Sequence, residues 1–119
     1  MSYVDGFVLP VPKKNLKAYQ QMAKVASKVW MDHGALSYQE AVGDDLNVKM
    51  GLPFPRLLKP KAGEVIVFAF ITYRSRAHRD RVNKKVMADP RLKASMEGKA
   101  MPFDFKRMVW GGFKGLVRA

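Results

Sequence analysis

The chain has 119 residues, enough for one domain with a single hydrophobic core and too few for two. It contains no cysteine, which excludes a disulfide framework, thiolate catalysis and cysteine-ligated metal sites and fits a reducing compartment. It carries 22 Lys and Arg against 10 Asp and Glu, a formal net charge of +12, so a nucleic acid or an anionic surface is the first partner to consider.

The first half of the chain predicts a strand, a helix and a second strand. Residues 3–9 predict the first strand, which ends at the Pro-Val-Pro sequence that follows because proline cannot donate to a sheet. Apolar residues at spacings of three and four predict a helix over residues 13–33, with Gly34 as its left-handed cap. Alternating polarity predicts a second strand over residues 35–42.

A long connection and a central strand follow. Residues 46–63 contain three prolines and two glycines, and the middle of this segment, residues 54–58, is expected to form an edge strand or an arm. Residues 64–74 predict the clearest strand. Both of its faces are apolar, which is typical of a central strand that is covered on both sides.

The last quarter predicts two helices and a final strand. Ser75 is expected to cap a helix over residues 76–88, and Asp89-Pro90 to begin a short helix that ends at Met96. The last strand is predicted over residues 106–117. Its Gly111-Gly112 pair suggests a bulge or a close backbone approach.

The predicted order of elements is βαββαβ, which is the ferredoxin-like pattern. We therefore expect residues 1–119 to form one α+β domain, a four-stranded antiparallel sheet with two main helices on one face. The first and third strands are central in this topology.

Helices on one face would leave the other face of the sheet open. We expect Tyr3, Phe7, Phe68 and Phe70 on the open face, with apolar residues from 108–110. Such a patch exceeds what soluble monomers usually expose, so a partner should cover it. The two alternatives are a second protomer packed sheet on sheet and single-stranded nucleic acid stacked on the aromatic rings.

The nucleic-acid alternative has partial support. Residues 66–73 match six of eight positions of the RNA-recognition pattern for a third strand, but lack its basic residue and its glycine. A basic cluster over residues 74–93 carries half of the net charge. It lies on the second helix, on the opposite side of the sheet from the aromatic residues. We therefore expect nucleic-acid binding to be weak or absent.

Several segments resemble a known family. They are the Trp30-x-x-His33-Gly34-Ala35-Leu36 sequence and residues 75–80, 85–91 and 101–104. Together they are similar to the YbaA-like family of small bacterial proteins, a domain of unknown function. The resemblance covers nearly the whole chain and implies a dimeric α/β barrel, in which two ferredoxin-like protomers pack through their sheets. It implies no activity.

Three residues are candidates for catalysis. His33 ends the first helix, where it is either a general base or a cap favoured by the helix dipole. His78 either reaches a pocket between helix and sheet or packs there. Asp5 interrupts an apolar strand and must be paired if it is buried, with Arg74, Arg76 or Arg107 as possible partners.

```
```

Other polar and aromatic residues leave alternatives open. Glu40 with Asp44 and Asp45 forms either a turn or a two-carboxylate site. Trp30, Tyr38 and Trp110 are candidate pocket residues, although aromatic residues at these spacings also form cores. No metal site is expected, because two histidines without ligand spacing do not hold zinc.

These observations predict a cytoplasmic homodimer that uses its sheet face as the interface and has no membrane segment, because the longest apolar run, residues 65–71, is too short to span a bilayer. The function expected is that of a small-molecule binder or a cofactor-free enzyme, with a pocket between sheet and helices and no cofactor. The alternatives are RNA or single-stranded DNA binding and a structural or regulatory interaction protein.

Overall fold

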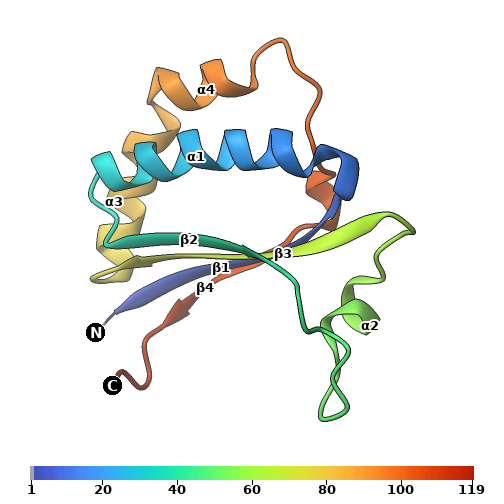
Figure 1. Ribbon diagram of the computed structural model, residues 1–119. Helices are drawn as coiled ribbons and strands as arrows, with labels where there is room; N and C mark the ends of the chain where they lie inside the picture. Colours follow the sequence, from blue (N-terminus) through green and yellow to red (C-terminus); the bar gives the residue numbers. More distant parts are fainter. Residues whose placement is uncertain (1) are drawn as a thin grey trace.

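A four-stranded antiparallel sheet forms the base of the molecule (Figure 1). The computed structural model describes residues 2–119. The order of the strands across the sheet is β2-β3-β1-β4, so the first and third strands are central. The strands are β1 (Tyr3–Pro12), β2 (Ser37–Val42), β3 (Glu64–Tyr73) and β4 (Val109–Lys114).

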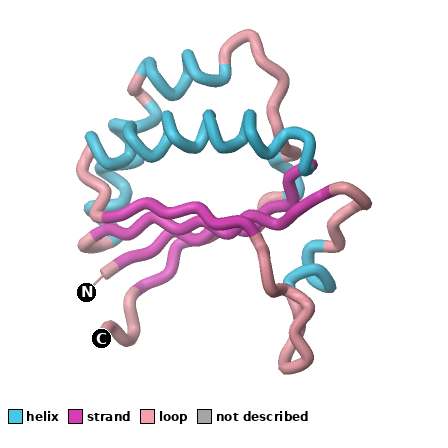
Figure 2. Tube along the Cα trace, viewed as in Figure 1, coloured by secondary structure: helices cyan, strands magenta, loops and turns pink. Residues whose placement is uncertain are grey.

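Three of the four α-helices lie on one face of this sheet (Figure 2). They are α1 (Leu16–Asp32), α3 (Arg76–Met87) and α4 (Pro90–Met96), and α1 packs against both of the others. The remaining helix, α2 (Phe54–Leu58), lies in the long connection on the other side of the sheet. Short 3-10 turns at Lys13–Asn15 and Phe105–Arg107 precede α1 and β4.

The helix ends follow from local sequence. The Ser75 hydroxyl accepts a hydrogen bond of 3.1 Å from the backbone N–H of His78, and the Asp89 carboxylate accepts one of 2.9 Å from the N–H of Arg91. Pro90 follows at the first helical position, where the missing N–H is harmless. Gly34 has a φ of 109°, which lets the chain turn from α1 into β2 without strain.

The odd-numbered residues of β1 lie beneath the helices and form the core. Leu9 and Val11 pack with Tyr19 of α1, and Tyr3 packs with Val29 and with residues of α3. Our expectation that Tyr3 and Phe7 lie on the open face was therefore wrong. The alternation along β1 was assigned correctly, but the helices cover the opposite face from the one expected.

The register of the pairs places five residues of β1, five of β3 and three each of β2 and β4 on the open face. Phe68 and Phe70 lie there, as the sequence predicts, and Phe68 is 45% exposed. The residues of this open face are Val4, Gly6, Val8, Pro10, Pro12, Ser37, Gln39, Ala41, Glu64, Ile66, Phe68, Phe70, Thr72, Val109, Gly111 and Phe113; of these, Pro10 and Ile66 are buried.

Two further expectations need correction. Residues 54–58 form the short helix α2 rather than an edge strand, and this helix sits in an arm that extends away from the sheet (Figure 1). The last strand is shorter than predicted, because residues 105–107 form a 3-10 turn and pairing with β1 ends at Lys114. A Cβ at Gly112 would collide with Tyr3 and lie 2.9 Å from Arg79, so this glycine marks the close approach that the sequence suggested.

The cap at Ser75 gives a direct test of how α3 begins. Ser75→Ala removes the acceptor for the N–H of His78 and should lower the free energy of unfolding by about 1 kcal/mol. Ser27→Ala is the matched control, since the Ser27 hydroxyl bonds only the Lys24 carbonyl within α1 and alanine is a better helix former. Urea unfolding measures both, and equal stability of the two variants would contradict the capping role.

Candidate functional site

A cavity of about 340 Å³ lies between α1 and the helix-facing side of the sheet. This volume falls within the range of small-molecule sites. The floor comes from β1, β2 and β3, and α1 forms one wall. The residues that line it are Phe7, Leu9, Tyr19, Met22, Ala23, Ala26, Trp30, Tyr38, Glu40, Ala69, Ile71, Met87, Leu92, Met96, Phe103, Phe105 and Met108.

Glu40 is the one charged side chain among these lining residues. Tyr19 of α1 donates a short hydrogen bond to Oε1 of Glu40, and Tyr38 of β2 donates one of 2.6 Å to Oε2. Tyr38 and Glu40 are two residues apart on one strand, so both side chains point beneath α1. The two phenols fix the carboxylate at the wall of an otherwise apolar space.

Burial and the adjacent Glu40 carboxylate raise the pKa of both Tyr19 and Tyr38 above the ordinary value of a phenol. Both hydroxyls therefore stay protonated and remain donors to Glu40. A carboxylate has about four acceptor positions, and the two phenols use one on each oxygen. Each oxygen can still accept a hydrogen bond from a bound molecule.

Trp30 is held in place at the opposite end of the cavity. Its indole N–H donates a hydrogen bond of 3.1 Å to Oδ1 of Asn83 on α3, and the same oxygen accepts a bond of 3.3 Å from Tyr73. The Trp30 and Tyr38 rings lie 6.1 Å apart. The aromatic wall is thus oriented by hydrogen bonds to residues outside the cavity, which is typical of a preorganised site.

Asp5 is buried beneath α3 rather than beside the cavity, with 1% of its surface exposed. Its partner is Arg79, whose Nε lies 3.6 Å from Oδ1 of Asp5, and not Arg74, Arg76 or Arg107 as the sequence suggested. Arg107 instead pairs with Glu64, at 2.7 Å. Burial raises the pKa of Asp5 above its ordinary value, and the Arg79 guanidinium opposes that rise.

His78 is also buried, with its Nδ1 accepting a hydrogen bond of 3.0 Å from the backbone N–H of Arg74. Its ring packs edge-on against Tyr73 at 5.9 Å. Burial, followed by the charges of Arg74 and Arg81, lowers the pKa of His78 below 6.5, so this side chain is a neutral acceptor at pH 7. These contacts give it a packing role at the start of α3.

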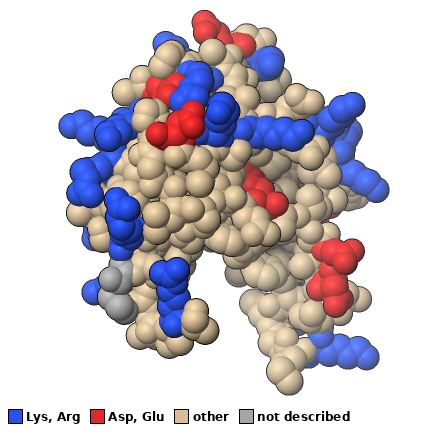
Figure 3. All heavy atoms as spheres, turned by 60° about the vertical axis from the view of Figure 1, so that its left-hand side comes forward, with Lys and Arg blue, Asp and Glu red and all other residues tan. Residues whose placement is uncertain are grey.

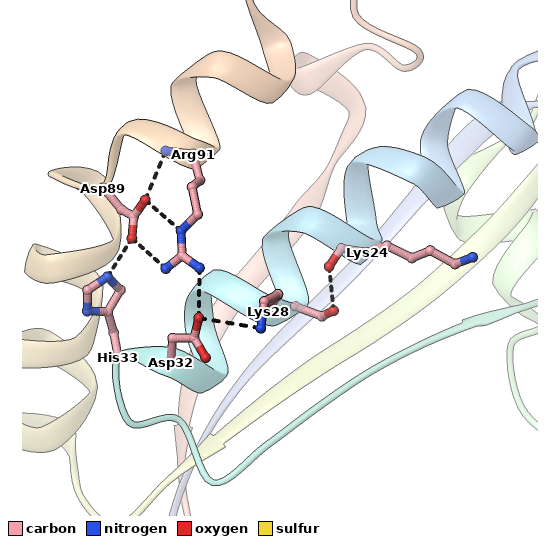
Figure 4. Close-up of polar contacts among 7 residues, drawn as sticks. Lys24, Lys28, Asp32, His33, Asp89 and Arg91 are labelled. Carbon is pink, nitrogen blue, oxygen red and sulfur yellow. Dashed lines mark hydrogen bonds and ion pairs between the residues drawn. The ribbon is translucent and has the colours of Figure 1, made fainter.

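His33 takes part in a polar cluster where the end of α1 meets the start of α4 (Figure 4). Its Nε2 lies 2.8 Å from Oδ2 of Asp89. Arg91 bridges Asp89 and Asp32 with contacts of 2.7 Å to each. Hydrogen bonds from Arg91 and then from His33 hold the pKa of Asp89 well below its usual range. The cluster joins two helices outside the cavity.

Comparisons with known proteins agree with this architecture. A family model described as "Protein of unknown function (DUF1428)" matches residues 2–105. The chain belongs to this family. Uncharacterized protein YbaA of Escherichia coli (strain K12) is 40% identical over 117 residues, which cover 98% of each chain, and the protein of that name in Shigella flexneri gives the same values. The resemblance found in the sequence is confirmed.

One solved structure has a similar fold. The structure of Rv0793 from Mycobacterium tuberculosis matches with a TM-score of 0.59 over 100% of this chain and 99% of that one, at 11% identity. At such low identity the likeness concerns the fold alone. The DUF1428 family model and the YbaA relatives likewise assign no specific activity.

The structure brings together only some of the predicted site residues. Trp30 and Tyr38 line the cavity, whereas Trp110 stacks on Phe7 at 5.9 Å and is 56% exposed. The catalytic candidates Asp5, His33 and His78 do not line it. The sequence pattern groups Glu40 with the acidic turn at 44–45, but its place two residues after Tyr38 indicates that it shares that residue's face.

Two absences concern the described residues 2–119. No group of three or more His, Asp or Glu side chains in this part of the chain is arranged to hold a metal ion. Nor does any helix there have the length and apolar character needed to cross a membrane.

The buried Asp5–Arg79 pair yields a prediction about stability. Arg79→Met leaves the Asp5 carboxylate buried without its cation and should lower the free energy of unfolding by about 3 kcal/mol at pH 7. Arg81→Met, at an exposed position on the same helix, should change it by less than about 0.5 kcal/mol. Urea unfolding measures both variants.

The pH dependence gives this prediction a second readout. The pKa of Asp5 in the folded protein is raised above 3.8, the ordinary value that applies in the unfolded chain. Between these two pKa values the folded state binds more protons than the unfolded state. The free energy of unfolding therefore falls as the pH rises through the folded pKa. Without Arg79 the pKa of Asp5 rises further. The decrease in the free energy of unfolding caused by Arg79→Met should therefore be smaller in acid. Adding Asp5→Asn should restore much of the stability at pH 7. A loss that neither acid nor Asp5→Asn reduces would contradict the pairing.

Proposed function

We propose that this protein binds a small, mainly apolar molecule in the cavity between α1 and the sheet. The observation that carries this proposal is the Glu40 carboxylate, held by Tyr19 and Tyr38 in a space otherwise lined by apolar and aromatic side chains. A few convergent polar groups in an apolar pocket are the usual features of a ligand site.

The charge of the site restricts the ligand. Glu40 has no Lys or Arg beside it in the cavity lining, so an anionic ligand would meet uncompensated repulsion. A ligand with one cationic or neutral hydrogen-bond donor would be favoured. The same carboxylate can accept a proton from an acidic group of the ligand, which is the step that a cofactor-free enzyme would use.

The proposal does not use Asp5, His33 or His78. Each of them is engaged in contacts that join elements of the fold, namely α3 to β1, the start of α3 to β3, and α1 to α4. The residues we propose for ligand binding are Trp30, Tyr38 and Glu40. Tyr19 is proposed as a positioning residue that orients the carboxylate.

We further infer a ferredoxin-like protomer that forms a homodimer through the open face of its sheet, as in a dimeric α/β barrel. Of the sixteen open-face positions Glu64 alone is charged, and it already pairs with Arg107, in a chain where 27% of residues are charged. A surface that bound nucleic acid through Phe68 and Phe70 would need Lys or Arg on that face. Figure 3 shows Lys and Arg side chains mainly around the helical half of the molecule. A mainly apolar face without a free charge instead favours a second copy of itself.

Matched probes test the cavity. Toluene, benzylamine and benzoate share one ring and differ in charge, and we expect binding to weaken in the order benzylamine, toluene, benzoate, as measured by NMR titration of the Trp30 indole N–H. Glu40→Gln should weaken benzylamine binding about tenfold and leave toluene binding unchanged, because it removes a charge-assisted hydrogen bond.

A cavity-filling variant provides the control. Ala26→Leu should abolish binding of all three probes while the chain stays folded, whereas Ala94→Leu, on an exposed position of α4 outside the cavity, should bind them normally. If neither Glu40→Gln nor Ala26→Leu changes the affinity for the probes, the proposal is overturned.

A further inference from the structure

The long connection between β2 and β3 forms an arm that projects from the side of the sheet away from the core helices (Figures 1 and 2). We define this arm as residues 43–63, which include α2. Its apolar side chains are unusually exposed, for example Met50 at 92% and Leu52 at 63%. Leu57, on α2, is 59% exposed. An arm that folded back on its own domain would bury such side chains.

The C-terminal tail, residues 115–119, shows the same property at the other end of the sheet. Leu116 and Val117 are 88% and 89% exposed. The tail also descends on the side away from the helices (Figure 1). Arm and tail therefore flank the open face, and both extend past it in the direction from which a partner would approach.

The strand register places the arm and the tail at opposite ends of β1. The arm returns at Glu64, which pairs with Pro12, the last residue of β1. The tail follows Lys114, which pairs with Tyr3, the first residue of that strand. At about 3.3 Å per residue the two ends of this ten-residue strand are roughly 30 Å apart. The arm and tail of one chain therefore start at opposite ends of the sheet.

The base of the arm carries charge opposite to that of the tail, although the four basic residues further along, Lys49, Arg56, Lys59 and Lys61, make residues 43–63 net positive. Asp44 and Asp45, at the base of the arm, are exposed, and neither forms an ion pair with another residue of the described chain. Arg118 in the tail is also exposed and without an ion-pair partner among residues 2–119. In a chain of net charge +12, these two carboxylates are favourable partners for such a cation.

From this placement we propose that the arm of one protomer seats on the C-terminal tail of a second copy, with its apolar side chains on Leu116 and Val117 and its acidic base near Arg118. The two-fold axis of such a dimer lies in the plane of the interface, perpendicular to the strands. Rotation about this axis places the arm end of one sheet over the tail end of the other. The contact then occurs twice in each dimer, as isologous symmetry requires. This inference rests on the proposed sheet-to-sheet homodimer and adds the segments that fix its orientation.

Engineered cysteines test the contact cleanly, because the chain contains none of its own. Met50→Cys with Leu116→Cys in one chain, treated with a short bismaleimide, should give at least tenfold more covalent dimer than either single variant. Met31→Cys with Leu116→Cys is the matched control, since Met31 lies on α1, on the other side of the sheet, and is 44% exposed. Denaturing electrophoresis reads the products, and light scattering gives the mass before cross-linking.

The outcomes separate this inference from the dimer itself. Cross-linked dimer in the arm–tail variant alone supports the arm–tail contact. A two-chain mass without cross-linked dimer, or a link within one chain, overturns the contact and leaves the sheet-to-sheet dimer standing. A one-chain mass overturns both, and a one-chain mass together with co-purified nucleic acid assigns the open face to that partner instead.

Discussion

The central constraint in this structure is that β1 and β3 are apolar on both faces while the core helices cover only one. On the covered face, Leu9, Val11 and Val67 pack beneath α1 and leave an apolar cavity beside Glu40. On the other face, Phe68 and Phe113 are 45% and 63% exposed. Burial of apolar surface is the main driving force of folding and association. The covered face therefore supplies the proposed ligand site, and the open face supplies the proposed interface.

The polar groups of the helical half divide into two sets with different roles. The Asp5–Arg79 pair and the buried His78 ring hold α3 against the sheet, and the His33–Asp89 contact joins α1 to α4 outside the cavity. Glu40 differs because its carboxylate borders a cavity and its only side-chain hydrogen bonds among the described residues come from Tyr19 and Tyr38. This difference in surroundings, rather than residue type, makes Glu40 the functional candidate over the two histidines.

Much of the architecture could be predicted from the sequence, because helix periodicity, caps and strand alternation are local signals. The starts of α3 and α4 follow directly from Ser75 and Asp89-Pro90. The face of β1 that the helices cover was predicted wrongly, since alternation separates the two faces but does not say which one is covered when both are apolar. Glu40 was missed as a site residue for a related reason: its role depends on the phenol of Tyr19, which comes from α1 and approaches only in the folded chain.

The proposed interface requires a second copy that covers the open face, and the mass of the protein in solution tests this most directly. Light scattering at micromolar concentration should give twice the 13.5 kDa of one chain. Phe68→Lys should shift the mass toward that of one chain, while Met31→Lys, at a helical position of nearly equal exposure, should leave it unchanged. A one-chain mass for the unmodified protein, or a two-chain mass that Phe68→Lys does not alter, would contradict the account.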